Sequence, residues 1–293
     1  MTEGWVWDES LFEGAAPHYR RGRLPYAPGL VPLLADVLAP DGTGRLLDVG
    51  CGPGTLTLPL AHLFDEVVGV DPDEGMIAEA LRCATAAGTG ARGRGRAVWV
   101  RMRAERLPAG LGSFDVALFG QSFHWMDRDL VAATVRDMLR PGGALVHVSP
   151  LAGESRDTSG LPWPDVPFGD IAGLVGEYLG PLRRAGRGVL PGGTPGGEAA
   201  VFAAAGFAEP ERYVVPGGQA LERDEDDVVS WTYSMSSSAP HLFGARLAAF
   251  EAELRRLLRA VSPTGRFSAR VPGTEVFVRR GPLTGRPADR LTG

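Results

Sequence analysis

The sequence predicts an α/β fold built on a mostly parallel sheet with helices on both faces. Short apolar runs typical of buried strands alternate with segments of helical apolar spacing from residue 45 onward, and such alternation builds parallel sheets. A glycine-rich turn directly follows the first expected strand. The chain has 293 residues, 44% of them hydrophobic, which is enough for one large domain with an elaborated cap. The expected strands are 45–49, 66–70, 97–101, 114–119, 144–149, 211–215 and 274–280.

Helical apolar spacing separates these strands. In the last expected helix, apolar residues from Phe243 to Val261 recur at alternating spacings of four and three. This stripe is most simply packing within the chain, with a dimer seam as the alternative, so we expect a monomer or a homodimer. The expected helices are 30–38, 54–64, 73–87, 127–139, 198–206, about 224–235 and 241–261.

Composition divides the chain into five parts. Residues 1–28 crowd Arg, Tyr and Pro and predict an irregular arm that closes over a ligand of the core, 29–149. Residues 150–197 are rich in Gly and Pro; a loop-rich insertion of this length is usually functional, so we expect a lid that contacts the substrate. Residues 198–282 complete the sheet and carry two inserted helices, and 283–293 form a tail.

The composition also excludes several classes of function. The net charge of −5 disfavours a nucleic-acid partner, which would favour a basic face. All 30 basic residues are Arg, so no lysine can form a Schiff base. Two cysteines are too few for a disulfide framework, and the five histidines show no metal-ligand spacing, so we expect no metal. The acidic N-terminus lacks a signal-peptide pattern and no apolar run reaches the ~20 residues of a membrane span, which predicts a cytoplasmic protein without a membrane partner.

The glycine-rich turn lies where ligands bind in an open α/β sheet, at the carboxyl end of a strand. Gly50, Gly52 and Gly54 follow Asp48 with the spacing G-x-G-x-G. The dinucleotide fingerprint G-x-G-x-x-G needs a glycine one place later, where this chain has Thr. Pro53 also removes a backbone N–H that a pyrophosphate would use. The turn is therefore shaped for a ligand that needs a close backbone more than an anion site.

Asp71 is the second candidate ligand-binding residue. It follows the second strand directly, where its carboxylate can accept hydrogen bonds from both hydroxyls of a ribose. The alternative is structural: Asp71 would be the N-cap of the next helix, with Pro72 at the first position and Glu74 closing a capping box. The two roles can coexist, and after a glycine-rich turn we favour the ligand.

Five motifs in order resemble the class I S-adenosylmethionine-dependent methyltransferases, in the small-molecule branch that contains ubiquinone-biosynthesis-type and trans-aconitate-type enzymes. The motifs span about residues 45–148 and read LLDVGCGPG, VVGVDPDEGMIAEA, RAERLP, FDVALFGQSFHWMD and MLRPGGALVHV. The resemblance implies a Rossmann-like, doubly wound, seven-stranded sheet. It also implies S-adenosylmethionine as the cofactor and S-adenosylhomocysteine as its product, and says little about the substrate.

The resemblance further implies which residues hold the methionine and ribose parts of the cofactor. Asp48 and the Gly50–Gly54 turn would hold the methionine part. Asp71, beside Pro72, would take the ribose hydroxyls. Gln121, just past the fourth strand, would face the methyl-bearing end.

The adenine and the carboxylate of the cofactor have candidates of the same origin. Met76 would lie on one face of the adenine, with Ala104 and Glu105 at its edge. Arg103 departs from the family, which often has an acidic residue there, and this leaves the adenine contact open. Three N-terminal residues are candidates to close over the carboxylate: Tyr19, Arg23 and Tyr26. The role suits arginine, whose guanidinium can donate two parallel hydrogen bonds to a carboxylate. The alternative is that these are surface residues of a mobile arm.

Methyl transfer from a sulfonium needs alignment of nucleophile, methyl and sulfur, and a nucleophile that carries a proton also needs a base. His124, at the carboxyl end of the fourth strand, is the candidate base or orienting group. The alternative is that the His-Trp pair at 124–125 only shapes its loop. The candidates for an apolar acceptor wall are aromatic residues, each of which alone is more often core: Trp125, Trp163, Phe168, Trp231 and Tyr233.

The sequence therefore predicts an enzyme that transfers a methyl group to O, N or C of a small-molecule acceptor, such as a specialised metabolite in natural product biosynthesis. Fold does not fix function, so a second hypothesis keeps the bound cofactor but uses it to promote a cyclisation or another rearrangement. A third is a non-catalytic binding partner. The intact turn, Asp71 and His124 count against it.

Overall fold

Seven strands form the central sheet, in the order β3-β2-β1-β4-β5-β11-β8. The computed structural model describes residues 8–88, 95–151, 159–190 and 196–281. β11 pairs antiparallel with β5 and with β8, while the other pairs of the sheet are parallel. This confirms the predicted doubly wound, mostly parallel sheet. The strands are β1 (Arg45–Val49), β2 (Glu66–Asp71), β3 (Arg96–Arg101), β4 (Phe114–Gly120), β5 (Leu139–Pro150), β8 (Glu211–Val215) and β11 (Thr274–Arg280).

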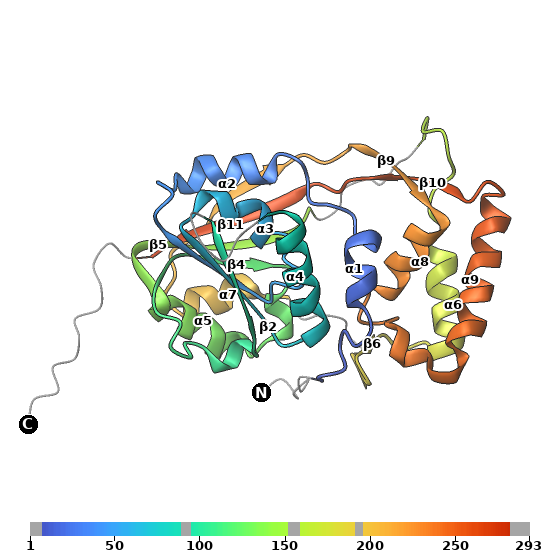
Figure 1. The fold of residues 1–293 in the computed structure, drawn as a ribbon, viewed down its shortest axis with the longest axis horizontal. Helices are drawn as coiled ribbons and strands as arrows, with labels where there is room; N and C mark the ends of the chain where they lie inside the picture. Colours follow the sequence, from blue (N-terminus) through green and yellow to red (C-terminus); the bar gives the residue numbers. More distant parts are fainter. Residues whose placement is uncertain (1–7, 89–94, 152–158, 191–195, 282–293) are drawn as a thin grey trace, which may run out of the picture.

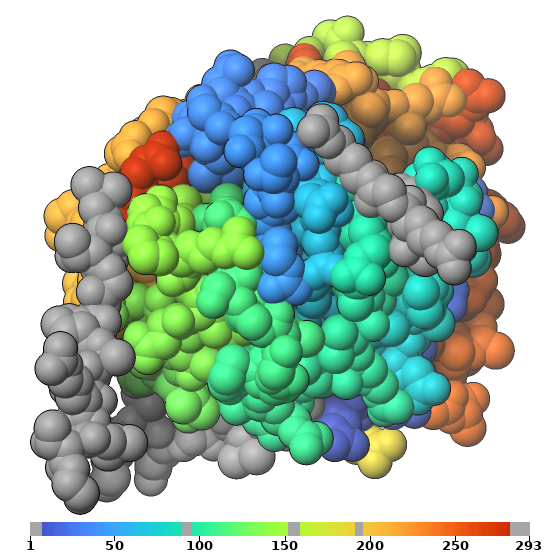
Figure 2. Space-filling view, turned by 60° about the vertical axis from the view of Figure 1, so that its left-hand side comes forward, coloured from blue at the N-terminus to red at the C-terminus, as the bar shows by residue number. Residues whose placement is uncertain are grey.

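Helices cover both faces of the sheet (Figure 1). Because side chains alternate along a strand, Leu46 and Leu47 of β1 belong to two different apolar clusters. The first cluster packs α2 and α3 on one face, and the second packs α5 and α7 on the other. Figure 2 shows α2, in blue, on the outside of the core against green and cyan segments. The helices of the core are α2 (Leu30–Leu38), α3 (Thr57–Leu60), α4 (Glu74–Ala86), α5 (Arg128–Met138) and α7 (Glu198–Ala204).

The helix after the glycine-rich turn is shorter than predicted. The sequence predicts 54–64, but α3 covers only Thr57–Leu60, and a 3-10 turn, Ala61–Leu63, follows it. Pro59 lies inside this segment and has no N–H to donate to the carbonyl four residues earlier, so a long regular α-helix does not form.

A cap of helices stands beside the sheet (Figure 1). It joins two segments that are far apart in the sequence, because one apolar cluster holds residues of α6 together with α8 and α9. The predicted stripe packs within the chain: Phe243, Phe250 and Leu254 are buried, although Val261 is exposed. The predicted helix 241–261 is interrupted at Gly244 (φ 52°, ψ −130°). The cap elements are α6 (Phe168–Leu179), β9 (Ala220–Asp224), α8 (Glu225–Tyr233), the 3-10 segment η4 (Pro240–Arg246), α9 (Leu247–Val261) and β10 (Arg266–Arg270), with a small pair, β6 (Arg184–Ala185) and β7 (Gly188–Val189), after α6.

The N-terminal arm is helical where the sequence predicts an irregular segment. Ala16–Gly22 form α1, which lies between α4 of the core and α8 of the cap (Figure 1). A Cβ on Gly22 would lie 2.4 Å from the carbonyl of Ser230, so the glycine lets the backbone of α1 rest directly on α8. α1 therefore joins the core to the cap.

The predicted tail, 283–293, lies outside the described residues. Within the described ranges, no helix has the length and apolar character that crossing a membrane requires. The same ranges contain no group of His, Cys, Asp and Glu side chains arranged to hold a metal ion.

Candidate functional site

The turn after β1 exposes its backbone to open space at one position. Gly50, Gly52 and Gly54 have positive φ angles of 72°, 53° and 78°. A Cβ on Gly50 would lie 2.5 Å from Cβ of Ser122, and one on Gly54 would lie 2.6 Å from the ring of Trp99, so these two glycines make room for protein side chains. A Cβ on Gly52 would meet no atom within 4 Å. Gly52 is the glycine whose bare backbone faces a ligand-sized space.

Asp71, at the end of β2, is bound to this turn. Its Oδ2 accepts the N–H of Gly52 and its Oδ1 accepts the N–H of Asp73, each at 2.9 Å. Burial raises the pKa of its carboxyl to about 6, so the group is ionised at pH 7. Asp73, and not Asp71, is the N-cap of α4, because its side chain accepts the N–H of Met76. Each oxygen of Asp71 keeps a lone pair for a further donor.

A first cavity of about 640 Å³ opens over the carboxyl ends of β1, β2 and β4. Asp71 lies on one wall and Glu105 on another. Oε1 of Glu105 accepts the N–H of Asp127 at 3.0 Å, and Nε of Arg103 donates to Oε2 at 3.2 Å. The cavity is mostly apolar with polar groups at its edges, as small-molecule sites are. The predicted residues that line it are Tyr19, Gly50, Gly52, Asp71, Pro72, Met76, Ala104, Glu105, Gln121 and Trp125.

A second cavity, of about 1070 Å³, adjoins the first and lies between the core and the cap. The two cavities share walls at Tyr19, Gly50, Gly52 and Gln121. A molecule whose nucleoside part fills the first can therefore reach the second. The remaining predicted residues that line the second cavity are Arg23, Tyr26, Asp48, Phe168 and Trp231.

Gln121 stands at the junction of the two cavities with a strained backbone. Its φ is 56°, a left-handed conformation that side-chain-bearing residues rarely adopt and that clusters at functional sites. Its Nε2 donates to the hydroxyl of Tyr26 at 3.4 Å. Burial raises the pKa of Tyr26, so the phenol keeps its proton.

Arg23 presents an unsatisfied donor beside the second cavity. Its Nη2 donates to the carbonyl of Ser234 at 2.8 Å, and its guanidinium lies 4.9 Å from the centroid of the Tyr19 ring. Its Nε is buried and has no hydrogen-bond partner within the described part of the chain. Buried donors are normally paired, so this atom indicates a missing acceptor.

Asp48 also lines the second cavity. Burial raises the pKa of its carboxyl to about 7, and the hydroxyl of Thr57 donates to its Oδ2 at 2.5 Å.

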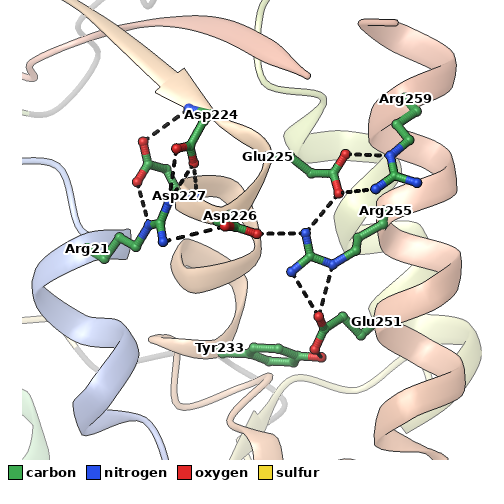
Figure 3. A network of polar contacts seen from close by, with 9 residues as sticks. All are labelled: Arg21, Asp224, Glu225, Asp226, Asp227, Tyr233, Glu251, Arg255 and Arg259. Carbon is green, nitrogen blue, oxygen red and sulfur yellow. Dashed lines mark hydrogen bonds and ion pairs between the residues drawn. The ribbon is translucent and has the colours of Figure 1, made fainter. Parts of the chain in front are cut away.

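An ion-pair network fixes α1 to the cap (Figure 3). Arg21 lies 2.9 Å from Asp224, 3.6 Å from Asp226 and 2.9 Å from Asp227, at the start of α8. Arg255 of α9 binds Asp226 from the other side at 2.7 Å. Single exposed pairs contribute little, whereas several charges in one network hold a geometry. The network therefore positions the residues of α1 that line the second cavity.

The five predicted aromatic residues separate into three places. The rings of Phe168 and Trp231 line the second cavity, with centroids 4.6 Å apart and edges turned to faces. Trp125 lines the first cavity instead. Trp163 donates its indole N–H to a glutamate of β9, and Tyr233 is buried inside the cap; neither lines the two cavities.

His124 also lines neither of the two cavities. It lies in the 3-10 turn after β4, with its ring centroid 4.8 Å from that of Trp125. Burial lowers its pKa to about 4, so the imidazole is neutral at pH 7. This placement favours the loop-shaping alternative, and the base assignment stays a prediction.

Sequence interpretation missed lining residues that belong to no motif. Phe12 precedes α1 and Met102 follows β3 in the first cavity, while Met235 follows α8 in the second. Met102 and Met235 lie at the border of an expected element, which is their one sequence signal, and Phe12 lies in an arm where no element was expected. Gly54, which was expected to bind the cofactor, lines neither cavity because it packs on Trp99.

A sheet of this order, with a bare glycine after β1 and a buried carboxylate after β2, defines a Rossmann-like nucleoside-binding protein. Comparison with known proteins adds the chemistry. Residues 47–147 match the family model described as a methyltransferase domain. Nocamycin O-methyltransferase of Saccharothrix syringae is 33% identical over 269 residues, which cover 87% of this chain and 91% of that protein. An uncharacterized methyltransferase of Mycobacterium tuberculosis is 36% identical over 139 residues, 47% of this chain and about half (51%) of the relative.

Among solved structures, the 4+2 cyclase SpnF superposes with a TM-score of 0.50 and 21% identity, covering 87% of this chain and 81% of that one. That likeness shows the fold. The chain belongs to the class I S-adenosylmethionine-dependent methyltransferases, and S-adenosylmethionine is its cofactor.

The two cavities fit that cofactor. The open space at Gly52 admits a ligand against the backbone, the ionised Asp71 suits a pair of hydroxyls, and the unpaired Nε of Arg23 suits a carboxylate.

Proposed function

We propose that this enzyme methylates an oxygen atom of a small-molecule specialised metabolite that binds in the second cavity. One observation carries the proposal: the first cavity is walled by Asp71 and opens at Gln121 onto a larger cavity between core and cap. Nocamycin O-methyltransferase, which matches most of this chain, supports an oxygen acceptor of this kind. Cys51 and Cys83 are buried and unpaired, which fits the reducing cytoplasm as the place of the reaction.

The roles of the cofactor residues follow from the cavity walls. We propose that Asp71 accepts the ribose hydroxyls, while Met76 and Ala104 enclose the adenine, with Glu105 at its edge. At the other end, Arg23 binds the carboxylate through its unpaired Nε, and Tyr19 and Tyr26 support it. The contact of the Arg23 guanidinium with the Tyr19 ring, and the presence of all three residues in the lining of the second cavity, support this assignment. Asp48, Gly50 and Gly52 line the path between the two ends, and Gln121 stands at the junction.

When bound, the cofactor supplies an activated methyl group with a neutral leaving group. The chain then has to hold the acceptor oxygen in line and exclude competing nucleophiles. Phe168 and Trp231 line the second cavity with their rings packed edge to face against each other, and they offer an apolar wall for the acceptor. An acceptor oxygen with an acidic proton is already ionised at pH 7 and needs no protein base, which agrees with the position of His124 outside the two cavities.

Methyl-labelled S-adenosylmethionine tests the proposal. The protein is incubated with the labelled cofactor and with hydroxylated and acidic small molecules, and products are separated by mass. Label on an oxygen of the product supports the proposal. A product that forms without label, while the cofactor stays intact, would establish the rearrangement hypothesis instead. Failure of calorimetry to detect binding of either S-adenosylmethionine or S-adenosylhomocysteine would favour the non-catalytic binding partner.

A further inference from the structure

A third cavity, of about 820 Å³, lies inside the cap between α6 and the end of α8. We call it the α6–α8 cavity. One face of α6 forms a wall, because Ile171, Val175 and Leu179 recur at helical spacing and all line it. At Gly176, between these residues, a Cβ would meet no atom within 4 Å, so the missing side chain widens the cavity.

The α6–α8 cavity continues the second cavity. Trp231 and Met235 line both, so the two spaces meet at these side chains. The indole of Trp231 is held by the ring of Phe168, 4.6 Å away. Methionine is unbranched and flexible, so Met235 can move aside and let a long molecule pass from one space to the other.

Of the hydroxyl groups that line the α6–α8 cavity, those of Thr232 and Ser238 are already engaged. The hydroxyl of Thr232 donates to the carbonyl of Val228 at 3.1 Å, and that of Ser238 donates to the carbonyl of Thr232 at 2.5 Å. The wall therefore offers an occupant mainly apolar surface.

Positive charge borders this cavity. Arg183 and Arg184 line it, and the described lining contains no Asp or Glu. Nε and Nη2 of Arg184 both donate to the carbonyl of Leu179, which anchors its guanidinium at the end of α6. Leu182, at the same rim, is 54% exposed. An apolar molecule with an acidic far end would match this combination of surfaces.

We propose that the acceptor is an elongated apolar molecule whose body fills the α6–α8 cavity and whose far end carries an anionic group facing Arg183 and Arg184. This inference rests on the proposed function, because it assumes that the reacting oxygen lies in the second cavity. It assigns the α6–α8 cavity as the determinant of acceptor length.

The test is a matched pair of glycine variants in α6. Gly176→Leu fills the cavity, and leucine favours a helix interior more than glycine does. Gly173→Leu is the control, because a Cβ at Gly173 would also meet no atom within 4 Å but this residue is exposed and lines none of the three cavities. Thermal melting and S-adenosylhomocysteine affinity are measured for both variants. We expect melting temperatures no lower than that of the wild type and an unchanged affinity for S-adenosylhomocysteine.

Straight-chain carboxylates from hexanoate to dodecanoate serve as probes, titrated by calorimetry into protein saturated with S-adenosylhomocysteine. We expect affinity to rise roughly fourfold per added CH2 until the cavity is full. Gly176→Leu should weaken the longest probe at least tenfold, which corresponds to the loss of about two buried methylenes, and Gly173→Leu should leave it unchanged. Affinity independent of chain length, or unaffected by Gly176→Leu, would overturn the proposal.

The charged end is tested separately with Arg183→Gln and the uncharged probe dodecanol. We expect the variant to weaken dodecanoate severalfold and to leave dodecanol unchanged. If Arg183→Gln weakens dodecanoate and dodecanol equally, the proposal that the far end of the acceptor is anionic is refuted. If the wild-type protein does not bind S-adenosylhomocysteine at all, the proposed function is refuted instead. Failure of the proposed function is therefore distinguishable from failure of the proposal on acceptor shape.

Discussion

Replacing Asp71 with Asn tests the centre of the cofactor site with almost no change of volume. In the wild type both carboxylate oxygens accept backbone N–H groups at 2.9 Å, from Gly52 and Asp73. An amide has one oxygen and one NH2, so in either orientation one backbone N–H faces another donor. The same change removes the negative charge that would bind the ribose hydroxyls.

The magnitude follows from these bonds. A hydrogen bond to a charged group contributes about 1.5–3 kcal/mol, and about 1.4 kcal/mol is a factor of ten in affinity. With one of two ribose bonds lost, Asp71→Asn should raise the Kd for S-adenosylhomocysteine about 10- to 100-fold. Isothermal titration at pH 8, where the wild-type carboxyl with its pKa of about 6 is ionised, measures the difference.

A matched control separates cofactor binding from folding. Asp115 also accepts a backbone N–H, that of Arg45 at 2.6 Å, but it lies at the start of β4, at the opposite end of the strand from the cavities. Asp115→Asn should leave the Kd unchanged while it lowers the melting temperature. A Kd for Asp71→Asn within threefold of the wild type, in a variant with unchanged circular dichroism, would refute the ribose assignment.

Three further variants probe other parts of the site. Arg23→Met removes the unpaired Nε and should weaken S-adenosylhomocysteine about tenfold or more in calorimetry, but should leave adenosine, which has no carboxylate, unaffected. His124→Ala should keep at least half the methylation rate at saturating acceptor, because its ring lines neither of the two cavities; a rate loss of 100-fold would restore it as the base. Arg21→Ala should raise the KM for the cofactor and make it less dependent on salt, since the ion pairs that hold α1 to the cap are gone; an unchanged KM would contradict the positioning role. Burial raises the folded-state pKa of Asp48 from its ordinary 3.8 to about 7, so its contribution to stability is complete below about pH 4 and is lost as the pH rises through 7. The melting temperature of the cofactor-free wild type should therefore fall between pH 4 and pH 7 relative to that of Asp48→Asn. Melting temperatures that change with pH in parallel for the two proteins would contradict the raised pKa of Asp48.

The core was predictable because its signals are local. Each strand of the sheet is a short apolar run, and alternation of strands and helices restricts the topology to a few choices. Most residues of the first cavity lie at the ends of β1, β2, β3 and β4 or directly after them, so the position of Asp71 or Glu105 in the sequence also gives its position in space.

The departures inside the core have identifiable physical causes. Pro59 shortens α3, and Asp73 takes the N-cap position that Asp71 might have occupied in a capping box. Two of the three glycines of the turn serve packing on Ser122 and Trp99, contacts that join residues more than 40 positions apart and that no spacing rule contains.

The cap was less predictable because its contacts are long-range. The Gly and Pro content of 150–197 outweighed the apolar spacing of Phe168, Ile171 and Val175, so the sequence predicts a loop where α6 forms. The apolar face of α6 is buried by α8 and α9, which lie some 50 or more residues later in the chain. A helix that depends on a distant partner for its burial gives only a weak local signal.

This difference between core and cap has a functional consequence. The residues proposed for the ribose and the adenine lie at the carboxyl ends of strands of one sheet, apart from Met76 of α4. The second cavity instead needs α1, α6 and α8 to meet, and these helices are joined by side-chain contacts such as Arg21 with Asp227 and Phe168 with Trp231. Substitutions in the cap can therefore change the acceptor without disturbing Asp71 or Gly52. A variant such as Gly176→Leu should shift acceptor preference toward shorter molecules while cofactor affinity stays constant, because Gly176 lines the α6–α8 cavity and neither of the other two cavities.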